Sequence, residues 1–249
     1  SIWLATVVVS GISYLSYLLK RYVFHESGVL VSGIIGGLYS STATISVLAR
    51  KSRKASEQEA NEYVAAMLLA VSMMFLRFMI LILIFSREIF TSIYPYLLIM
   101  SVVAAVVAWF IHSRHRRSKD MADESEDEDS SNPLEFKVAL IFATLFVVFT
   151  VLTHYTLVYA GTGGLNLLSF VSGLSDITPF ILNLLQNTGS VAVLVVVACS
   201  MQAIISNILV NMFYALFFAG KGSKLRPWIL GGFGTVIGVN LVLLLFFYL

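Results

Sequence analysis

Two ionisable side chains inside apolar stretches are the residues best placed for chemistry. Arg77 lies within the run 63–85, and Asp176 lies within the run 164–181. A charge deep in a membrane segment costs at least ~2.5 kcal/mol on insertion scales, so such residues face a cavity or one another. We therefore expect an ion pair. One interpretation is structural, and the pair fixes how two halves pack. The other is functional: Asp176 titrates or binds a cation, and Arg77 receives an anionic group or locks one conformational state.

Hydroxyl side chains gather in two glycine-containing stretches, residues 28–46 and 164–181. The first holds four glycines and six Ser or Thr residues where a plain spanning helix carries Leu and Val. Such hydroxyls either supply oxygens to a partly dehydrated ion or polar solute, or bond across packed helices, where small residues are enriched. Packing explains any single hydroxyl, whereas the cluster favours a site. The candidate ligands are Ser40, Ser41, Thr42, Thr44, Ser175 and Thr178.

Two amides complete the candidate site. Asn207 and Asn211 are four positions apart, so they share one face of a helix. A buried amide must find hydrogen-bond partners. These side chains therefore either bond a neighbouring helix or line the same cavity as the charged pair.

Other chemistries find no support in the sequence. It has no nucleophile elbow, metalloprotease helix or phosphate loop, so we expect neither an enzyme nor a cofactor. The four histidines form no metal-ligand pattern, and metal ligands are left unassigned. No basic face with interleaved aromatics indicates nucleic acid. The single cysteine, Cys199, excludes an intrachain disulfide.

The elements that must position these residues are membrane helices. Of 249 residues, 58% are hydrophobic and only 12% charged, and the apolar ones form runs of about 18 or more. This composition predicts an all-α polytopic membrane protein embedded in a lipid bilayer. The expected spanning helices cover residues 2–19, 63–85, 94–111, 136–159, 191–218 and 227–249.

The chain also reads as two similar halves. An offset of 136 places Gly37-Leu38 on Gly173-Leu174, Ser40 on Asp176 and Thr42 on Thr178. We expect a first membrane repeat over 1–112, a charged flexible linker over 113–133 and a second repeat over 134–249. Glycine- or proline-interrupted segments at matching places in two repeats point to a transporter binding site.

Loop charges decide between two topologies. If both glycine-hydroxyl stretches cross the membrane, nine cations face six across it, which is a poor bias. If both enter and leave on one side, fourteen cations share a side and only Arg87 faces the other. The second arrangement gives each half three spanning helices plus one re-entrant or broken helix. Three is odd, so the second half is inverted, and the linker 113–133 is expected to be cytoplasmic. Full crossing stays the alternative, since each stretch has about the 20 residues that a span needs.

The first stretch also carries a family resemblance. Residues 33–44 read Gly-Ile-Ile-Gly-Gly-Leu-Tyr-Ser-Ser-Thr-Ala-Thr, followed by Leu-Ala-Arg-Lys-Ser at 48–52. This pattern, with Ser-Gly-Leu-Ser-Asp at 172–176 and Ser206-Asn207, resembles the C-terminal membrane domain of unknown function in MgtC/SapB-type proteins. The resemblance covers nearly the whole chain, although Asn211 stands where that pattern has Lys. It implies a prokaryotic inner (cell) membrane and a link to divalent-cation homeostasis. Because the chain begins at Ser1 and not at Met, a longer parent protein is one interpretation.

Two functions follow as hypotheses. The first is a transporter or channel-like protein that moves a small ion or polar solute between the two broken elements. The second is a non-transporting regulatory or scaffold subunit, in which the same glycines and hydroxyls serve packing, homo-oligomerisation or association with an MgtC-like partner. A solvated cavity between the elements favours the first, and a dry, tightly packed junction favours the second.

Overall fold

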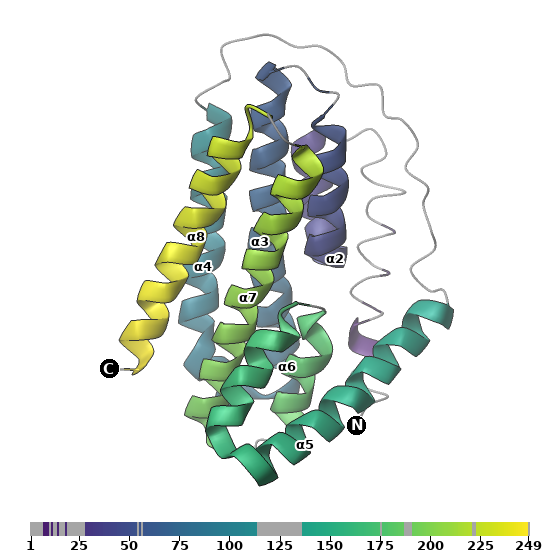
Figure 1. Ribbon diagram of the computed structural model, residues 1–249, viewed down its shortest axis with the longest axis vertical. Helices are drawn as coiled ribbons and strands as arrows, with labels where there is room; N and C mark the ends of the chain where they lie inside the picture. Colours follow the sequence, from purple (N-terminus) through teal and green to yellow (C-terminus); the bar gives the residue numbers. More distant parts are fainter. Residues whose placement is uncertain are drawn as a thin grey trace.

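A computed structural model of the chain is entirely helical over the residues that it describes (Figure 1). These residues are 28–53, 55, 57–113, 136–174, 176–186, 191–220 and 223–248, with 7–9, 11, 14 and 18 near the start. Most of the predicted first span and of the predicted linker 113–133 lie outside them, as does the candidate residue Ser175.

Seven helices carry the described part of the fold. They are α2 (Val29–Lys51), α3 (Glu57–Phe85), α4 (Arg87–Ser113), α5 (Phe136–Ser172), α6 (Ile177–Gln186), α7 (Val193–Ala219) and α8 (Arg226–Tyr248). Five of them, α2, α3, α4, α7 and α8, are long and apolar enough to cross a membrane. The chain is therefore an all-α protein of the multi-pass membrane type.

The junction between α3 and α4 differs from its prediction. The expected span 94–111 starts too late, because α4 begins at Arg87 and Pro95 lies inside it. Ser86 alone separates the helices, and its Oγ accepts the Ile89 amide at 3.4 Å. A serine that caps the first turn lets a new helix start at once. The expectation failed because proline, a helix breaker in water, is tolerated inside membrane helices.

Helix α2 is broken in the middle. Ser40 has φ −157° and ψ 105°, which is extended backbone inside an otherwise helical segment. A Cβ built on Gly36 would lie 2.5 Å from Oγ1 of Thr44. In a continuous helix these two residues would be about 12 Å apart along the axis. The two arms of α2 therefore fold back beside each other at Ser40.

Two interruptions shape the corresponding region of the second half. Helix α5 turns at Gly161, whose φ of 58° and ψ of −151° suit glycine almost exclusively. Its last segment, Gly163–Ser172, ends at a second turn, and the chain continues as α6 (Figure 1). Pro179 lies in the first turn of α6, where its missing amide hydrogen is not needed. The break falls just before it. We call α2 the first broken element, and Gly163–Ser172 together with α6 the second broken element.

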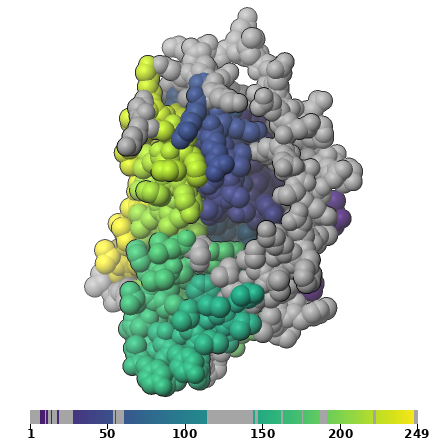
Figure 2. Space-filling model, turned by 45° about the vertical axis from the view of Figure 1, so that its right-hand side comes forward, coloured from purple at the N-terminus to yellow at the C-terminus, as the bar shows by residue number. Residues whose placement is uncertain are grey.

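The two broken elements occupy opposite ends of the bundle. In Figure 1, α2 lies in the upper half and α6 in the lower half, with α3 and α7 running past both. The first broken element contacts α3 and α7, and the second contacts the same two helices. Figure 2 shows α7 and the α2–α3 region side by side above the end of α5.

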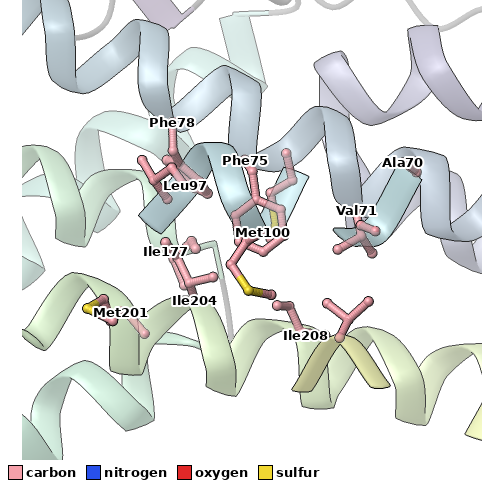
Figure 3. Packing of buried hydrophobic residues seen from close by; sticks show 14 of the residues in the cluster. Ala70, Val71, Phe75, Phe78, Leu97, Met100, Ile177, Met201, Ile204 and Ile208 are labelled. Atoms are coloured by element: carbon pink, nitrogen blue, oxygen red, sulfur yellow. The ribbon is translucent and has the colours of Figure 1, made fainter. Parts of the chain in front are cut away.

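An apolar core joins α3, α4, α6 and α7. Figure 3 shows Ile177, the first residue of α6, between Phe78 and Leu97 on one side and Ile204 on the other. None of these four side chains is more than 2% exposed. The start of α6 is thus held in a buried, apolar part of the bundle.

Cations after α2 cap the end of α7. Arg53 donates from Nε to the Phe218 carbonyl and from Nη2 to the Phe217 carbonyl, the latter at 3.2 Å. The Arg50 guanidinium lies 4.3 Å from the centre of the Phe218 ring. Positive groups at a helix C-terminus satisfy its free carbonyls and its dipole. The base of the first broken element and the α7–α8 connection therefore lie at the same end of the molecule.

Candidate functional site

Arg77 lies between the two broken elements. From its place on α3 it donates from Nη1 to the Tyr39 carbonyl at 2.8 Å and from Nη2 to Thr178 Oγ1 at 3.4 Å. Tyr39 directly precedes the break in α2, and Thr178 is in the first turn of α6. One side chain, only 9% exposed, thus bonds to both elements.

Asp176 meets the start of α6. Its Oδ1 accepts the Thr178 amide at 2.9 Å, which satisfies one of the free N–H groups at the helix N-terminus. Asp176 also attracts Arg77 electrostatically. The expected ion pair between Arg77 and Asp176 stays a prediction, because the hydrogen bonds of Arg77 that bridge the elements go to Tyr39 and Thr178. Unlike Arg77, Asp176 is an exposed residue.

One nitrogen of Arg77 is unpaired. Its Nε is fully buried and has no hydrogen-bond partner among the described residues. A buried N–H without a partner costs about 1–3 kcal/mol, and more when the group is charged. The guanidinium therefore lies between the two broken elements with an unsatisfied buried donor.

The hydroxyls of the first broken element divide by role. Ser40 caps the second arm of α2, because its Oγ accepts the Ala43 amide at 3.3 Å. Thr44 lies against Gly36 inside the fold-back, and Ser41 is buried at 8% exposure. Thr42 uses its carbonyl to accept Ser46 Oγ at 2.8 Å. Only Ser40 lies at the break itself, so packing accounts for the contacts of the others.

Glycines in the first broken element permit close helix packing. A Cβ on Gly33 would lie 2.3 Å from the Ala66 carbonyl oxygen, and one on Gly37 would lie 2.5 Å from the Ala70 Cα. Both alanines are on α3. Small residues four apart on each helix bring the backbones together, which holds the Tyr39 carbonyl within reach of Arg77.

The amides of α7 serve the second broken element. Asn207 donates to the Gly173 carbonyl at 3.3 Å, and Asn211 donates to Asn207 Oδ1 at 3.1 Å. A Cβ on Gly173 would lie 2.3 Å from the Ser206 Cβ, so this glycine is required for the approach. Asn211 Oδ1 is buried without a partner, like the Arg77 Nε.

The two broken elements are supported in parallel ways. A side chain from α3 bonds the carbonyl at the first break, and a side chain from α7 bonds the carbonyl at the second. Ser40 and Asp176, matched by the offset of 136, both cap the helical arm that follows. Half-helix ends that meet between long helices are the type of site that transporters use for ions and charged solutes.

Several polar contacts were not predicted as part of the site. Ser169 Oγ lies 2.8 Å from Gln202 Oε1, and the Cys199 thiol lies 3.3 Å from Asn166 Oδ1, both between Gly163–Ser172 and α7. The helical spacing of Cys199, Gln202 and Ser206 was the available signal. The Tyr39 carbonyl carried no signal, because every residue has one.

Metal ligation receives no support from the described residues. Among them, no group of three or more His, Cys, Asp or Glu side chains is arranged to hold a metal ion.

Sequence comparison places the chain in a family whose function is not known. The domain of unknown function DUF4010 matches residues 7–219. A protein from Aquifex aeolicus (strain VF5), described as an uncharacterized protein, is 27% identical over 221 residues, which is 88% of this chain and 94% of that protein. No solved structure matches. The MgtC/SapB resemblance stays a prediction. Since the match spans most of its length, this chain belongs to the DUF4010 family.

Proposed function

We propose that this protein is a membrane transporter or channel-like protein for a small ion or polar solute, with its site where the two broken elements approach Arg77. One observation carries the proposal. A buried arginine on a long apolar helix bonds the backbone at one break and the first turn after the other. A charge at such depth is costly and is typical of substrate or ion pathways.

The proposed architecture is two inverted repeats, each with three spanning helices and one re-entrant element. Three observations support it. The first broken element folds back on itself at Ser40. Each broken element contacts both α3, from the first proposed half, and α7, from the second. Two related halves are expected to show this, because each broken element then packs against a long helix of its own half and the equivalent helix of the other half. The elements also lie toward opposite ends of the bundle (Figure 1).

The proposed orientation follows from the cations. The contact of Arg53 with the Phe217 and Phe218 carbonyls brings the residue just after α2 and the end of α7 to one end of the molecule. In the arrangement where all elements cross, the cations at 50–54 and those at 221–226 are expected on opposite sides. The re-entrant arrangement, with these loops and the linker 113–133 in the cytoplasm of a prokaryotic cell, agrees better with the positive-inside rule.

In the proposed mechanism Asp176 is the group that binds a cation or proton. Its carboxylate is exposed and still within the electrostatic reach of Arg77. A cation at Asp176 weakens its attraction for Arg77. Because the Arg77 bonds to Tyr39 and Thr178 join the two broken elements, a shift of Arg77 away from Asp176 changes the relative position of the elements. Cation binding at Asp176 can in this way shift the protein between a state in which the site opens to one side of the membrane and a state in which it opens to the other.

Flux measurements on purified protein in liposomes test the proposal. Asp176→Asn keeps a side-chain oxygen that can accept the Thr178 amide, so it removes charge while preserving the cap. We expect proton- or cation-coupled flux, screened over a panel of ions and amino acids, to be lost. Glu88→Gln makes the same chemical change at an exposed helix end and should keep wild-type flux. Unchanged flux in Asp176→Asn rejects the role of Asp176.

The second candidate function is a non-transporting regulatory or scaffold subunit, with an MgtC-like protein or a second copy as partner. Two observations favour it, because a tightly packed junction is what a rigid scaffold is expected to have. Gly33 and Gly37 approach α3 closely, and the start of α6 is packed among side chains that are at most 2% exposed. Absence of flux for the whole panel, together with stable co-purification with such a partner, is the result that this alternative expects.

A further inference from the structure

The unpaired Nε of Arg77 identifies a position where an acceptor is missing. A guanidinium has five N–H donors in one plane, and Nε–H points the same way as one Nη2–H, so the two form a fork. In this fork Nε has no partner, and Nη2 reaches Thr178 Oγ1 only at 3.4 Å, beyond the usual range for N–H···O bonds. The opposite side is occupied, because Nη1 bonds the Tyr39 carbonyl.

The incompletely paired Nε–Nη2 edge of Arg77 suits one ligand chemistry. An arginine fork matches the two oxygens of a carboxylate or of another oxyanion, and such paired bonds are about twice as strong as neutral ones. The second arm of α2 starts next to Tyr39 and is capped by the neutral hydroxyl of Ser40. The partial positive charge of this helix end therefore remains available to an anion.

Resting on the transport function proposed above, we propose that the Nε–Nη2 edge of Arg77 binds a carboxylate or other oxyanion of the transported solute, together with a cation at Asp176. Thr178 lies on the same edge and provides a hydroxyl next to the bound oxygens. The inference deepens the proposed function by naming the substrate class as an anion that travels with a cation.

Charge balance explains why the two ions should bind together. Arg77 and Asp176 cancel each other when the site is empty. An anion alone leaves one net negative charge next to the carboxylate of Asp176, and electrostatic repulsion then weakens its binding. A cation at the exposed carboxylate restores neutrality, so each ion raises the affinity for the other.

Binding to the full chain in lipid nanodiscs tests this inference without requiring transport. Acetate, phosphate, sulfate and chloride are titrated as sodium and as choline salts, and the stabilisation against thermal unfolding is fitted to an apparent Kd. We expect saturable binding of at least one of the three oxyanions. We expect a weaker Kd in choline than in sodium, and little effect of chloride. Separate titrations distinguish a carboxylate solute from an inorganic oxyanion.

Three variants assign the site. Arg77→Lys keeps a positive charge that can bond Tyr39 but lacks the fork, and should weaken oxyanion binding about tenfold or more. Thr178→Val removes the hydroxyl on the same edge and should weaken it less. Asp176→Asn should remove the difference between sodium and choline. If Arg77→Lys does not give folded protein, Thr178→Val tests whether the oxyanion binds at the Nε–Nη2 edge. Asp176→Asn then tests whether a cation binds together with it.

Specific outcomes overturn the inference. These are saturation by none of the three oxyanions, equal binding in folded Arg77→Lys and wild type, or equal binding of chloride and the oxyanions. Flux that does not depend on any oxyanion leaves the transport proposal standing and removes this inference. Oxyanion binding that is weakened in the variants as expected, without flux of any solute, rejects the transport proposal and leaves the oxyanion site at Arg77 standing.

Discussion

The Arg77 guanidinium replaces a helical hydrogen bond at the main-chain carbonyl of Tyr39. In an unbroken α2 this carbonyl would accept the Ala43 amide. That amide instead donates to Ser40 Oγ at 3.3 Å, and Arg77 Nη1 bonds the Tyr39 carbonyl at 2.8 Å. Two side chains thus satisfy two of the backbone groups that the break releases. The break can therefore persist in an apolar environment, where unsatisfied backbone groups are expensive.

Replacement of Arg77 should destabilise the first broken element. We expect Arg77→Met to lower the free energy of unfolding by about 1.5–3 kcal/mol, the usual contribution of a hydrogen bond to a charged group. Arg77→Lys should lose less, since its ammonium can still donate to the Tyr39 carbonyl. Chemical unfolding in detergent micelles measures both. Equal stability of Arg77→Met and wild type would show that the guanidinium does not hold the break.

A methyl group at Gly37 should push α2 away from α3. We expect Gly37→Ala to destabilise the protein by about 1–3 kcal/mol, because the new Cβ meets the Ala70 backbone, which cannot rotate aside. The matched control is Gly234→Ala on α8, where a Cβ has no atom within 4 Å. That variant should be neutral or slightly stabilised. Equal effects at the two positions would contradict the close α2–α3 packing.

The turn at Gly161 should depend on its backbone conformation alone. We expect Gly161→Ala to cost about 1–3 kcal/mol, because its φ of 58° strains a residue with a side chain. No atom within 4 Å opposes a Cβ there, so crowding does not contribute. Gly163→Ala, two residues later and equally open, should be tolerated. Thermal unfolding of the two variants separates strain from crowding.

The contact between α4 and α8 should show as coupling between Tyr96 and Asn240. The Tyr96 hydroxyl donates to Asn240 Oδ1, and both residues are buried. We expect Tyr96→Phe to cost about 0.6–1.7 kcal/mol, the range measured for hydrogen bonds between membrane helices. Tyr96→Phe combined with Asn240→Leu should recover most of this loss, since no polar group is then left unpaired. Additive losses in a double-mutant cycle would argue against the bond.

The turn of the second broken element should be accessible to water if the protein transports. Leu174 is 58% exposed, whereas Leu182 on α6 is fully buried. In a background with Cys199→Ala, we expect Leu174→Cys to react with a membrane-impermeant thiol reagent from one side of a liposome, and Leu182→Cys to stay unmodified. Labelling of Leu174→Cys only by a lipid-soluble reagent would place this turn against lipid and weaken the transport proposal.

Patterns within single segments were predicted well. The apolar runs located the ends of most long helices to within a few residues. The cost of a buried charge singled out Arg77, which is buried, whereas Asp176 is exposed. The internal offset matched Ser40 with Asp176, which both prove to be caps. These succeeded because hydrophobic run length, the cost of buried charge and capping chemistry act locally. The membrane orientation of the chain and the inverted relation of its two halves stay predictions.

The sequence by itself determined that this is a helical membrane-type protein with two glycine-containing stretches and a buried arginine, because the bilayer penalises charge and free backbone groups residue by residue. Only the tertiary structure decided that α2 reverses at Ser40, that Arg77 bonds Tyr39 and Thr178, and that Gly33, Gly37 and Gly173 lie at close helix contacts. Those outcomes depend on which backbone groups come within about 3 Å of each other across helices. No local pattern encodes that distance, since every residue carries the same carbonyl and amide.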